Sequence, residues 1–153
     1  MQLPEALHRI KMLCASAEKC THDVEAKLAE WGLAEDEIEA ITTALNSGGF
    51  LNDARYAKSY VSEKRNLDKW GRIKIEHALQ QKQIDDTLIE AAISEIDNSE
   101  YIQSLHEILL KKYREVKSDD PNADAKRIMM HASSKGYEEE LVEEWLHKNL
   151  PLE

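Results

Sequence analysis

The fold is decided by residues 50–84, which read FLNDARYAKSYVSEKRNLDKWGRIKIEHALQQKQI. Asn52 or Asp53 offers a side-chain oxygen to the free N–H groups of a helix's first turn, and apolar residues then recur at spacings of three and four. The turn at 66–71 interrupts this pattern, and a second helix begins near Arg72. The stretch therefore predicts two helices joined as a hairpin.

The composition of the whole chain extends this prediction to an all-α fold. Of 153 residues, 42% are hydrophobic and 33% are charged, which is typical of a folded domain. Only five Gly and three Pro interrupt the chain, which favours helices joined by short turns. No apolar run reaches the roughly 18 residues of a membrane span, and no secretion leader is recognisable, so we expect a cytoplasmic protein with no membrane contact.

An internal repeat organises the chain. Shifting the sequence by 51 residues places Val24 on Ile75, and a further shift of 53 places Ile75 on Ile128. A unit of about 50 residues buries too little core to be stable alone, so neighbouring units should pack on each other. We predict three tandem three-helix repeats packed end to end into an elongated, curved array. The expected parts are repeat 1 (1–48), repeat 2 (49–97), repeat 3 (98–150) and a tail or expression-tag remnant (151–153).

Each repeat should contain three helices whose ends carry local signals. Asp120 and Pro121 supply an N-cap and a proline at the first helical position, where its missing N–H is tolerated. Ser47, Gly48 and Gly49 end the first repeat, because glycine accepts the left-handed conformation that stops a helix. The expected helices are Leu3–Cys14, Val24–Trp31 and Glu35–Leu45; Ala54–Lys64, Ile73–Lys82 and Thr87–Ile96; and Tyr101–Val116, Ala123–Ser134 and Glu138–Leu146.

Charge is distributed unevenly along a chain whose net charge is −10. Residues 55–82 hold eight basic side chains against three acidic ones, so the local charge is reversed in the middle repeat. A solvated face explains such a cluster, but Trp70 in a polar turn between cations is also typical of a binding surface, unless it covers the hairpin's own core. We expect Arg65, Arg72 and Lys74 to be exposed and dispensable for folding. The candidate contact residues are Arg55, Lys58, Arg65, Lys69, Trp70, Arg72, Lys74 and Lys82.

No stretch of the chain indicates catalysis. The sequence lacks the glycine-rich phosphate-binding patterns and the nucleophile elbow, so we predict no catalytic residue and no cofactor. Cys14 and Cys20, with His8 and His22 nearby, make a metal site conceivable, but their spacing lacks the paired geometry of known sites, and we predict reduced thiols and no metal. His106 begins a zincin-like pattern without the second histidine, so it should be a solvated or boundary residue.

Several of these segments together resemble one known family. In the middle repeat they are Leu51–Ala57, Lys69–Gly71 and Leu79–Ile84, and the outer repeats contribute Trp31–Gly32 and Lys135–Tyr137. This pattern resembles the RecX family, bacterial modulators of the RecA recombinase. The chain departs from it at Gln83, where the family usually has glycine to close the second helix.

The resemblance implies a regulator of homologous recombination, DNA repair and the SOS response. Such a protein would bind the RecA nucleoprotein filament as a monomer and inhibit or modulate its ATPase, strand exchange and growth, without being an enzyme. The alternatives are a helical-repeat module that binds nucleic acid directly, or one that scaffolds another protein. The net charge of −10 weighs against strong binding to bare DNA, although weak contact through the central basic patch remains an alternative.

Overall fold

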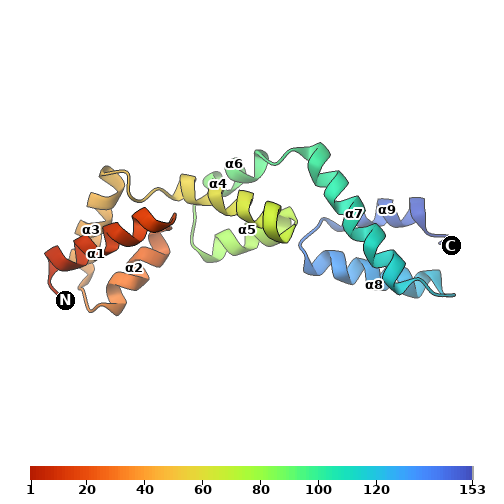
Figure 1. The fold of residues 1–153 in the computed structure, drawn as a ribbon, viewed down its shortest axis with the longest axis horizontal. Helices are drawn as coiled ribbons and strands as arrows, with labels where there is room; N and C mark the ends of the chain where they lie inside the picture. Colours follow the sequence, from red (N-terminus) through yellow and green to blue (C-terminus); the bar gives the residue numbers. More distant parts are fainter. Residues whose placement is uncertain (153) are drawn as a thin grey trace. The chain divides into compact units, whose positions relative to one another are not determined.

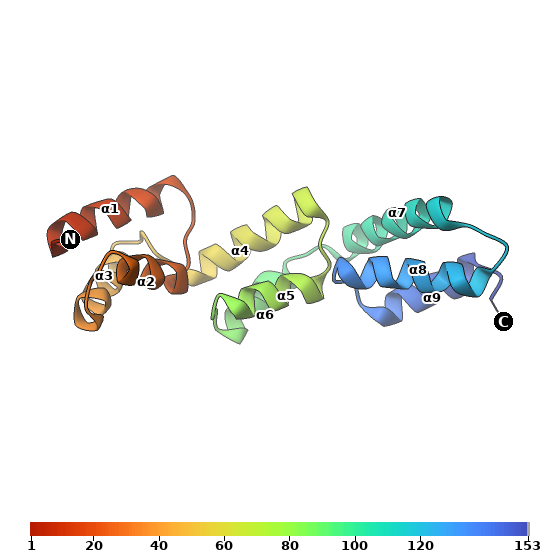
Figure 2. The same cartoon turned by 90° about the horizontal axis from the view of Figure 1, so that it is seen from below.

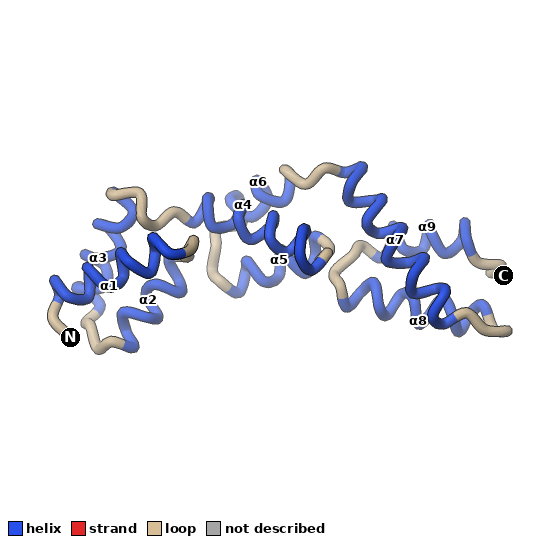
Figure 3. Tube along the Cα trace, viewed as in Figure 1, coloured by secondary structure: helices blue, strands red, loops and turns tan. Residues whose placement is uncertain are grey.

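The computed structural model describes residues 1–152, and they are helical throughout, with short connections (Figure 1, Figure 3). This confirms the predicted all-α fold of tandem three-helix repeats, and the predicted helix ends differ from the observed ones by no more than one turn. Within the described residues there are nine α-helices and one π-helical segment. They are α1 (Leu3–Ser16), α2 (Thr21–Glu30), α3 (Glu35–Ser47), α4 (Asp53–Glu63), η1 (Lys64–Asp68), α5 (Arg72–Gln81), α6 (Asp86–Ser94), α7 (Asn98–Val116), α8 (Pro121–Ser134) and α9 (Glu139–Asn149).

By packing, the chain divides into two compact units. Unit 1 comprises Met1–Tyr60 and Leu79–Ala92, and unit 2 comprises Val61–Ala78 and the residues from Ile93 onward. The residues of the middle repeat are therefore shared between the units. The repeat boundaries at 48/49 and 97/98 describe the periodicity of the sequence and stay a prediction.

In unit 1, the helices α1, α2 and α3 pack on one another (Figure 2). Their apolar faces meet because buried residues recur three or four positions apart on each helix. The resulting core contains Ala6, Ile10, Cys14, Val24, Leu28, Leu33, Ile41, Leu45 and Leu51.

In unit 2, α8 packs against both α7 and α9 (Figure 2). Two tyrosines, Tyr101 and Tyr137, are among its largest fully buried side chains, and their ring centroids lie 5.2 Å apart. The core contains Tyr101, Leu105, Leu109, Ile128, Ala132, Tyr137, Val142, Trp145, Leu146 and Leu150. Leu152, in the predicted tail at 151–153, also packs against this cluster, so this part of the tail belongs to the fold. Glu153 lies outside the described residues.

The helix signals read from the sequence are present. Asn52 caps α4, because its side-chain Oδ1 accepts the Arg55 N–H at 3.0 Å. Asp120 caps α8 in the same way through the Ala123 N–H at 3.2 Å, with Pro121 at the first helical position. The apolar positions expected in the central hairpin are all buried, namely Ala57, Val61, Ile75 and Leu79.

The turn between the second and third helices has the same conformation in all three repeats. Gly32, Gln83 and Gly136 all have positive φ values, of 86°, 56° and 88°. Gln83 therefore closes α5 in the left-handed conformation that the family usually assigns to glycine. In each turn the next N–H reaches back to the preceding helix: Leu33 to the Leu28 carbonyl at 3.2 Å, Ile84 to Leu79 at 3.3 Å, and Tyr137 to Ala132 at 3.1 Å.

Candidate partner-contact site

The eight candidate contact residues are divided between the two compact units. They come from the first half of α4, from η1, from the following turn, and from α5 and the residue after it. Unit 1 holds Arg55, Lys58 and Lys82, and unit 2 holds Arg65, Lys69, Trp70, Arg72 and Lys74.

Arg65 is buried, so the prediction that it is exposed is wrong, and its contacts argue against the expectation that it is dispensable for folding. Its side chain is 5% exposed. One terminal nitrogen, Nη1, donates to the Trp70 carbonyl and to the Tyr137 hydroxyl, both at 2.8 Å. The other, Nη2, donates to both carboxylate oxygens of Glu100, at 3.0 and 3.1 Å, and the guanidinium carbon lies 4.8 Å from the Tyr101 ring centroid. The planar fork of arginine thus ties the hairpin turn to the third repeat.

The spacing of the sequence explains this burial. Ala57, Val61 and Arg65 follow one another at intervals of four, so Arg65 continues the buried line of α4. It lies only about 40° from Val61 around a helix of ~100° per residue, but about 80° from Arg55 on the supposed outer stripe. Arg65 itself lies within the π-helical segment Lys64–Asp68, which ends in the left-handed Lys69 with φ 56°.

Arg72 and Lys74 are also only partly exposed, which corrects the same prediction for them. The Arg72 guanidinium donates to Glu138 at 2.8 Å and to the Asn98 side chain at 3.1 Å, and it lies 3.8 Å from the Tyr101 ring centroid. Lys74 donates from Nζ to the Ser134 carbonyl at 3.2 Å. Both cations therefore bind the third repeat.

The N-terminus of α5 is capped by the third repeat rather than by its own side chains. A helix leaves its first N–H groups without partners inside the helix. Here the Gly71 N–H donates to the Lys135 carbonyl at 2.7 Å, and the Ile73 N–H donates to the Gly136 carbonyl at 3.0 Å. Since those carbonyls lie at the end of α8, the positive end of one helix meets the negative end of another.

A buried tyrosine completes this cap. The Tyr101 hydroxyl accepts the Arg72 N–H at 3.0 Å and donates to the Glu138 carboxylate. Burial, together with the hydrogen bond to Glu138, raises the pKa of Tyr101, so the hydroxyl keeps its proton.

Backbone contact at this joint leaves no room for side chains. A Cβ atom on Gly71 would lie 2.3 Å from the Gly136 carbonyl oxygen, and one on Gly136 would lie 2.3 Å from Lys74 Cβ. Both positions require glycine because two stretches of backbone meet there.

Unit 1 contains a related joint between the first and middle repeats. Asp53, at the start of α4, accepts the Thr21 N–H at 2.8 Å and the Thr21 hydroxyl at 3.0 Å. In both units, therefore, a side chain at the start of a first helix caps the second helix of the preceding repeat.

Two more candidate cations are engaged at this joint. Arg55 Nε donates to both carboxylate oxygens of Glu18, at 2.7 and 2.8 Å, and Lys82 Nζ lies 3.0 Å from the Asp23 carboxylate. The hydrogen bond to Asp23 raises the pKa of Lys82 despite opposing desolvation. Because the side chains of Arg55 and Lys82 are 45% and 38% exposed, each ion pair adds little stability.

The accessible part of the candidate set in unit 2 centres on the turn after η1. Lys69 is exposed, and Trp70 is half-buried. The ammonium groups of Lys64 and Lys74 lie over the Trp70 ring, 4.6 and 4.4 Å from its centroid. Leu67, within η1, is 75% exposed. In unit 1, Lys58 is exposed on α4.

The thiols and histidines that suggested a metal site are not grouped as ligands. Within the described residues, no three or more His, Cys, Asp or Glu side chains are arranged to hold a metal ion. Both cysteines are buried and free, and burial raises the pKa of Cys20 to about 11. A membrane span is also absent among the described helices, since none is long and apolar enough.

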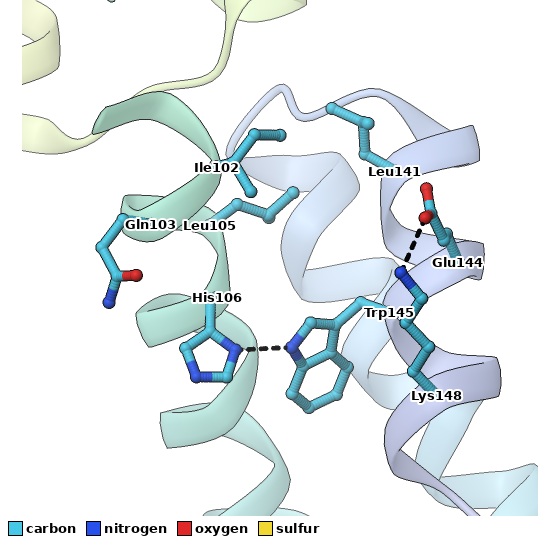
Figure 4. A pocket seen from close by; sticks show the side chains of 8 residues that line it. All are labelled: Ile102, Gln103, Leu105, His106, Leu141, Glu144, Trp145 and Lys148. Atoms are coloured by element: carbon cyan, nitrogen blue, oxygen red, sulfur yellow. Dashed lines mark hydrogen bonds and ion pairs between the residues drawn. The ribbon is translucent and has the colours of Figure 1, made fainter. Parts of the chain in front are cut away.

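A hollow of ≈ 280 Å³ lies between α7 and α9 in unit 2 (Figure 4). At its edge the Trp145 Nε1–H donates to His106 Nδ1 at 2.9 Å, and Lys148 donates to Glu144 at 2.8 Å. His106 is half-buried, as expected for a boundary residue. Its Nδ1 is occupied by the indole, so this histidine serves the packing of α9.

The residues that sequence reasoning missed are the partners of the cations. They are Glu100 and Glu138 at the starts of helices and the two tyrosines of the unit 2 core. Tyr137 follows the turn glycine, at the position where the other repeats have Leu33 and Ile84. This replacement of an aliphatic residue by tyrosine was the feature of the sequence that could have indicated a buried hydrogen-bonding partner.

These observations define a class: an all-helical tandem-repeat protein whose middle repeat is fastened to its neighbours by caps and ion pairs. The family model described as "RecX, second three-helix domain" matches residues 52–93. The regulatory protein RecX of Clostridioides difficile is 30% identical over 116 residues, covering 76% of this chain and 55% of that protein. The chain belongs to the RecX family.

Two further comparisons cover nearly the whole chain. The regulatory protein RecX of Prosthecochloris aestuarii is 24% identical, with 95% of this chain and 94% of that protein covered. The crystal structure of RecX from Lactobacillus salivarius has a TM-score of 0.86 at 21% identity, with 95% of each chain covered. The chain covers 56% of the regulatory protein RecX of Clostridium acetobutylicum and 55% of that of Clostridioides difficile, so it spans little more than half the length of these two relatives.

Proposed function

We propose that this chain regulates homologous recombination by binding the RecA nucleoprotein filament and inhibiting or modulating its ATPase, strand exchange and growth. Membership of the RecX family carries this proposal. The protein would act as a cytoplasmic monomer by binding alone, without chemistry of its own.

Direct binding to nucleic acid is the weaker alternative. Phosphate-driven affinity requires several cations that can replace counterions. Of the candidate cations, Arg55, Arg65, Arg72 and Lys82 are paired with carboxylates of the same chain. The net charge of −10 adds long-range repulsion toward DNA.

The contact surface proposed for the filament lies in unit 2 and consists of Lys69 and Trp70 in the turn after η1 and of Lys74 at the start of α5. Trp70 supplies a large and rigid contact area, and the cations beside it favour an acidic partner surface. Arg55, Arg65, Arg72 and Lys82 act mainly through the joints of the fold.

Co-sedimentation with RecA on single-stranded DNA tests the function, together with RecA's DNA-dependent ATP hydrolysis. We expect the chain to pellet with the filament and to slow hydrolysis at substoichiometric to stoichiometric ratios. Unchanged RecA activity over a wide range of ratios would refute the proposal.

Matched charge reversals test the surface. K69E, at an exposed residue outside the joint contacts, should keep the helical circular dichroism signal and lose most filament affinity. K111E or K126E, each of which changes the net charge equally at an exposed residue of the third repeat, should have a much smaller effect. Equal loss in both variants would mean that net charge, and not this turn, determines binding.

A further inference from the structure

A second accessible surface lies in unit 1, along the groove between α1 and α2. Two adjoining hollows of ≈ 280 and ≈ 400 Å³ share Leu13 and Lys27 in their linings. The floor is apolar: Ile10 and Val24 are buried beneath it, and Trp31 closes one end.

The apolar side chains along this groove are unusually exposed. Met12 is 61% exposed and Leu13 is 36% exposed. They lie on α1 beside the half-buried Trp31 of α2. Contiguous apolar exposure of this kind, when bordered by charge, marks an interaction surface.

The charge around the groove is opposite to that of its repeat. Residues 1–48 hold four basic against nine acidic side chains, yet three of the four cations, Arg9, Lys19 and Lys27, line these hollows. The Arg9 guanidinium lies 5.3 Å from the Trp31 ring centroid, which extends the aromatic end with a cation.

The carboxylates near the groove are paired with a cation outside the groove or form only a long, exposed ion pair with one of its lysines. Asp23 lines one hollow but is paired with Lys82 at 3.0 Å. Glu30 lies 3.8 Å from Lys27, and both of those side chains are well exposed. Among the described residues, no carboxylate forms an ion pair with Arg9. The groove therefore keeps a positive border around an apolar floor.

We propose that this groove binds an acidic amphipathic helix of a partner protein. Its apolar face would cover Met12, Leu13 and Trp31, and its carboxylates would meet Arg9, Lys19 and Lys27. An amphipathic helix laid in an apolar groove is a recurring recognition mode, and complementary charge gives it orientation. This site is separate from the filament surface proposed above and does not depend on it.

A synthetic peptide tests the groove in the full chain. The probe is a fluorescently labelled amphipathic peptide of about 15 residues, long enough to form a helix, with leucine on one face and glutamate on the other. We expect saturable binding by fluorescence anisotropy, which weakens as salt is added because exposed charges are screened. A peptide with glutamine in place of glutamate should bind at least roughly tenfold more weakly.

Variants locate the binding. R9E/K27E should weaken binding at least roughly tenfold, because like charges would then face the peptide. M12Q, which removes an exposed apolar side chain without changing the charge, should weaken binding through the loss of apolar contact instead. K111E/K126E is the matched control with the same change in net charge and should bind like the wild-type chain. Circular dichroism and the melting temperature establish that each variant is folded.

Several results would overturn the proposal. These are the absence of saturable binding, equal binding by R9E/K27E and the wild type, or equal binding of the glutamine peptide. Binding of a single-stranded oligonucleotide that depends on Arg9 and Lys27 would assign the groove to nucleic acid. A dimer in sedimentation velocity that R9E/K27E dissociates would assign it to a second copy of the chain.

Discussion

Replacing Arg65 with alanine should destabilise unit 2, because Arg65 is the buried centre of the joint between the middle and third repeats. The substitution removes four hydrogen bonds, two to Glu100 and one each to the Trp70 carbonyl and the Tyr137 hydroxyl. It also leaves a hollow beside the Tyr101 ring, where the guanidinium now packs.

The magnitude follows from the surroundings of each partner. Removing one member of a buried ion pair costs about 3–5 kcal/mol. Glu100 is 47% exposed and can regain water, and the buried Nε–H of Arg65 has no acceptor among the described residues. The loss should therefore fall at the lower end of that range. We expect R65A to reduce the free energy of unfolding of unit 2 by about 3 kcal/mol.

Hydrogen exchange measures this change at the joint itself. The amides of Gly71 and Ile73 are bonded to carbonyls of the third repeat, so they report its opening. A loss of about 3 kcal/mol corresponds to roughly 100-fold faster exchange, provided that these amides exchange by opening of the joint. In unit 1, amides such as that of Leu28 should exchange as in the wild type.

Two control variants sharpen the test. R65K keeps the charge but loses the planar fork, so it should lie between the wild type and R65A. K69Q changes an exposed neighbour and should alter stability by less than about 0.5 kcal/mol. If R65A exchanges at Gly71 and Ile73 as slowly as the wild type, Arg65 does not hold the repeats together and the reasoning fails.

Four further outcomes are expected. Q83G should raise stability by about 1 kcal/mol in chemical denaturation, since it relieves a left-handed non-glycine residue, and an unchanged midpoint would contradict this. G136A should be strongly destabilising in the same assay, because its Cβ would lie 2.3 Å from Lys74 Cβ. Cys20 should react with a thiol reagent far more slowly in the native than in the denatured chain, because the thiol is buried with a pKa of about 11. Burial and nearby lysines lower the pKa of His131 in the folded chain. The stability that this shift contributes is complete above the unfolded pKa of about 6.5 and is lost as the pH falls toward the folded pKa. H131Q should therefore lose less stability than the wild type between neutral and mildly acidic pH.

The repeat architecture was predictable because it rests on local patterns. Apolar periodicity located the helices, and short capping signals such as Asn52 and Asp120 located their starts. The matching offsets of Gly32 and Gly136 also indicated the common turn, whose conformation Gln83 shares despite its side chain.

The candidate site was less predictable, because a cation on a helix has the same sequence signature whether it faces solvent or a neighbouring repeat. The partners of Arg65 and Arg72 lie between 26 and 72 positions away in the chain, apart from the Trp70 carbonyl. No local rule connects residues so distant. Only the interval of four that links Val61 to Arg65 pointed to burial, and it competed with a charge count that suggested a surface.

The structure therefore changes what a charge-reversal experiment on the middle repeat can mean. A variant that includes R65E would place a carboxylate against Glu100 and between two tyrosines, so it would disrupt the joint before any partner is added. Loss of partner binding in such a variant would report a damaged fold. Substitutions at exposed Lys69 avoid this ambiguity, because Lys69 contributes to the joint through its backbone carbonyl. That carbonyl accepts the Tyr137 hydroxyl at 2.7 Å and is retained whatever the side chain. Binding energy and folding energy can then be measured on separate residues of the same turn.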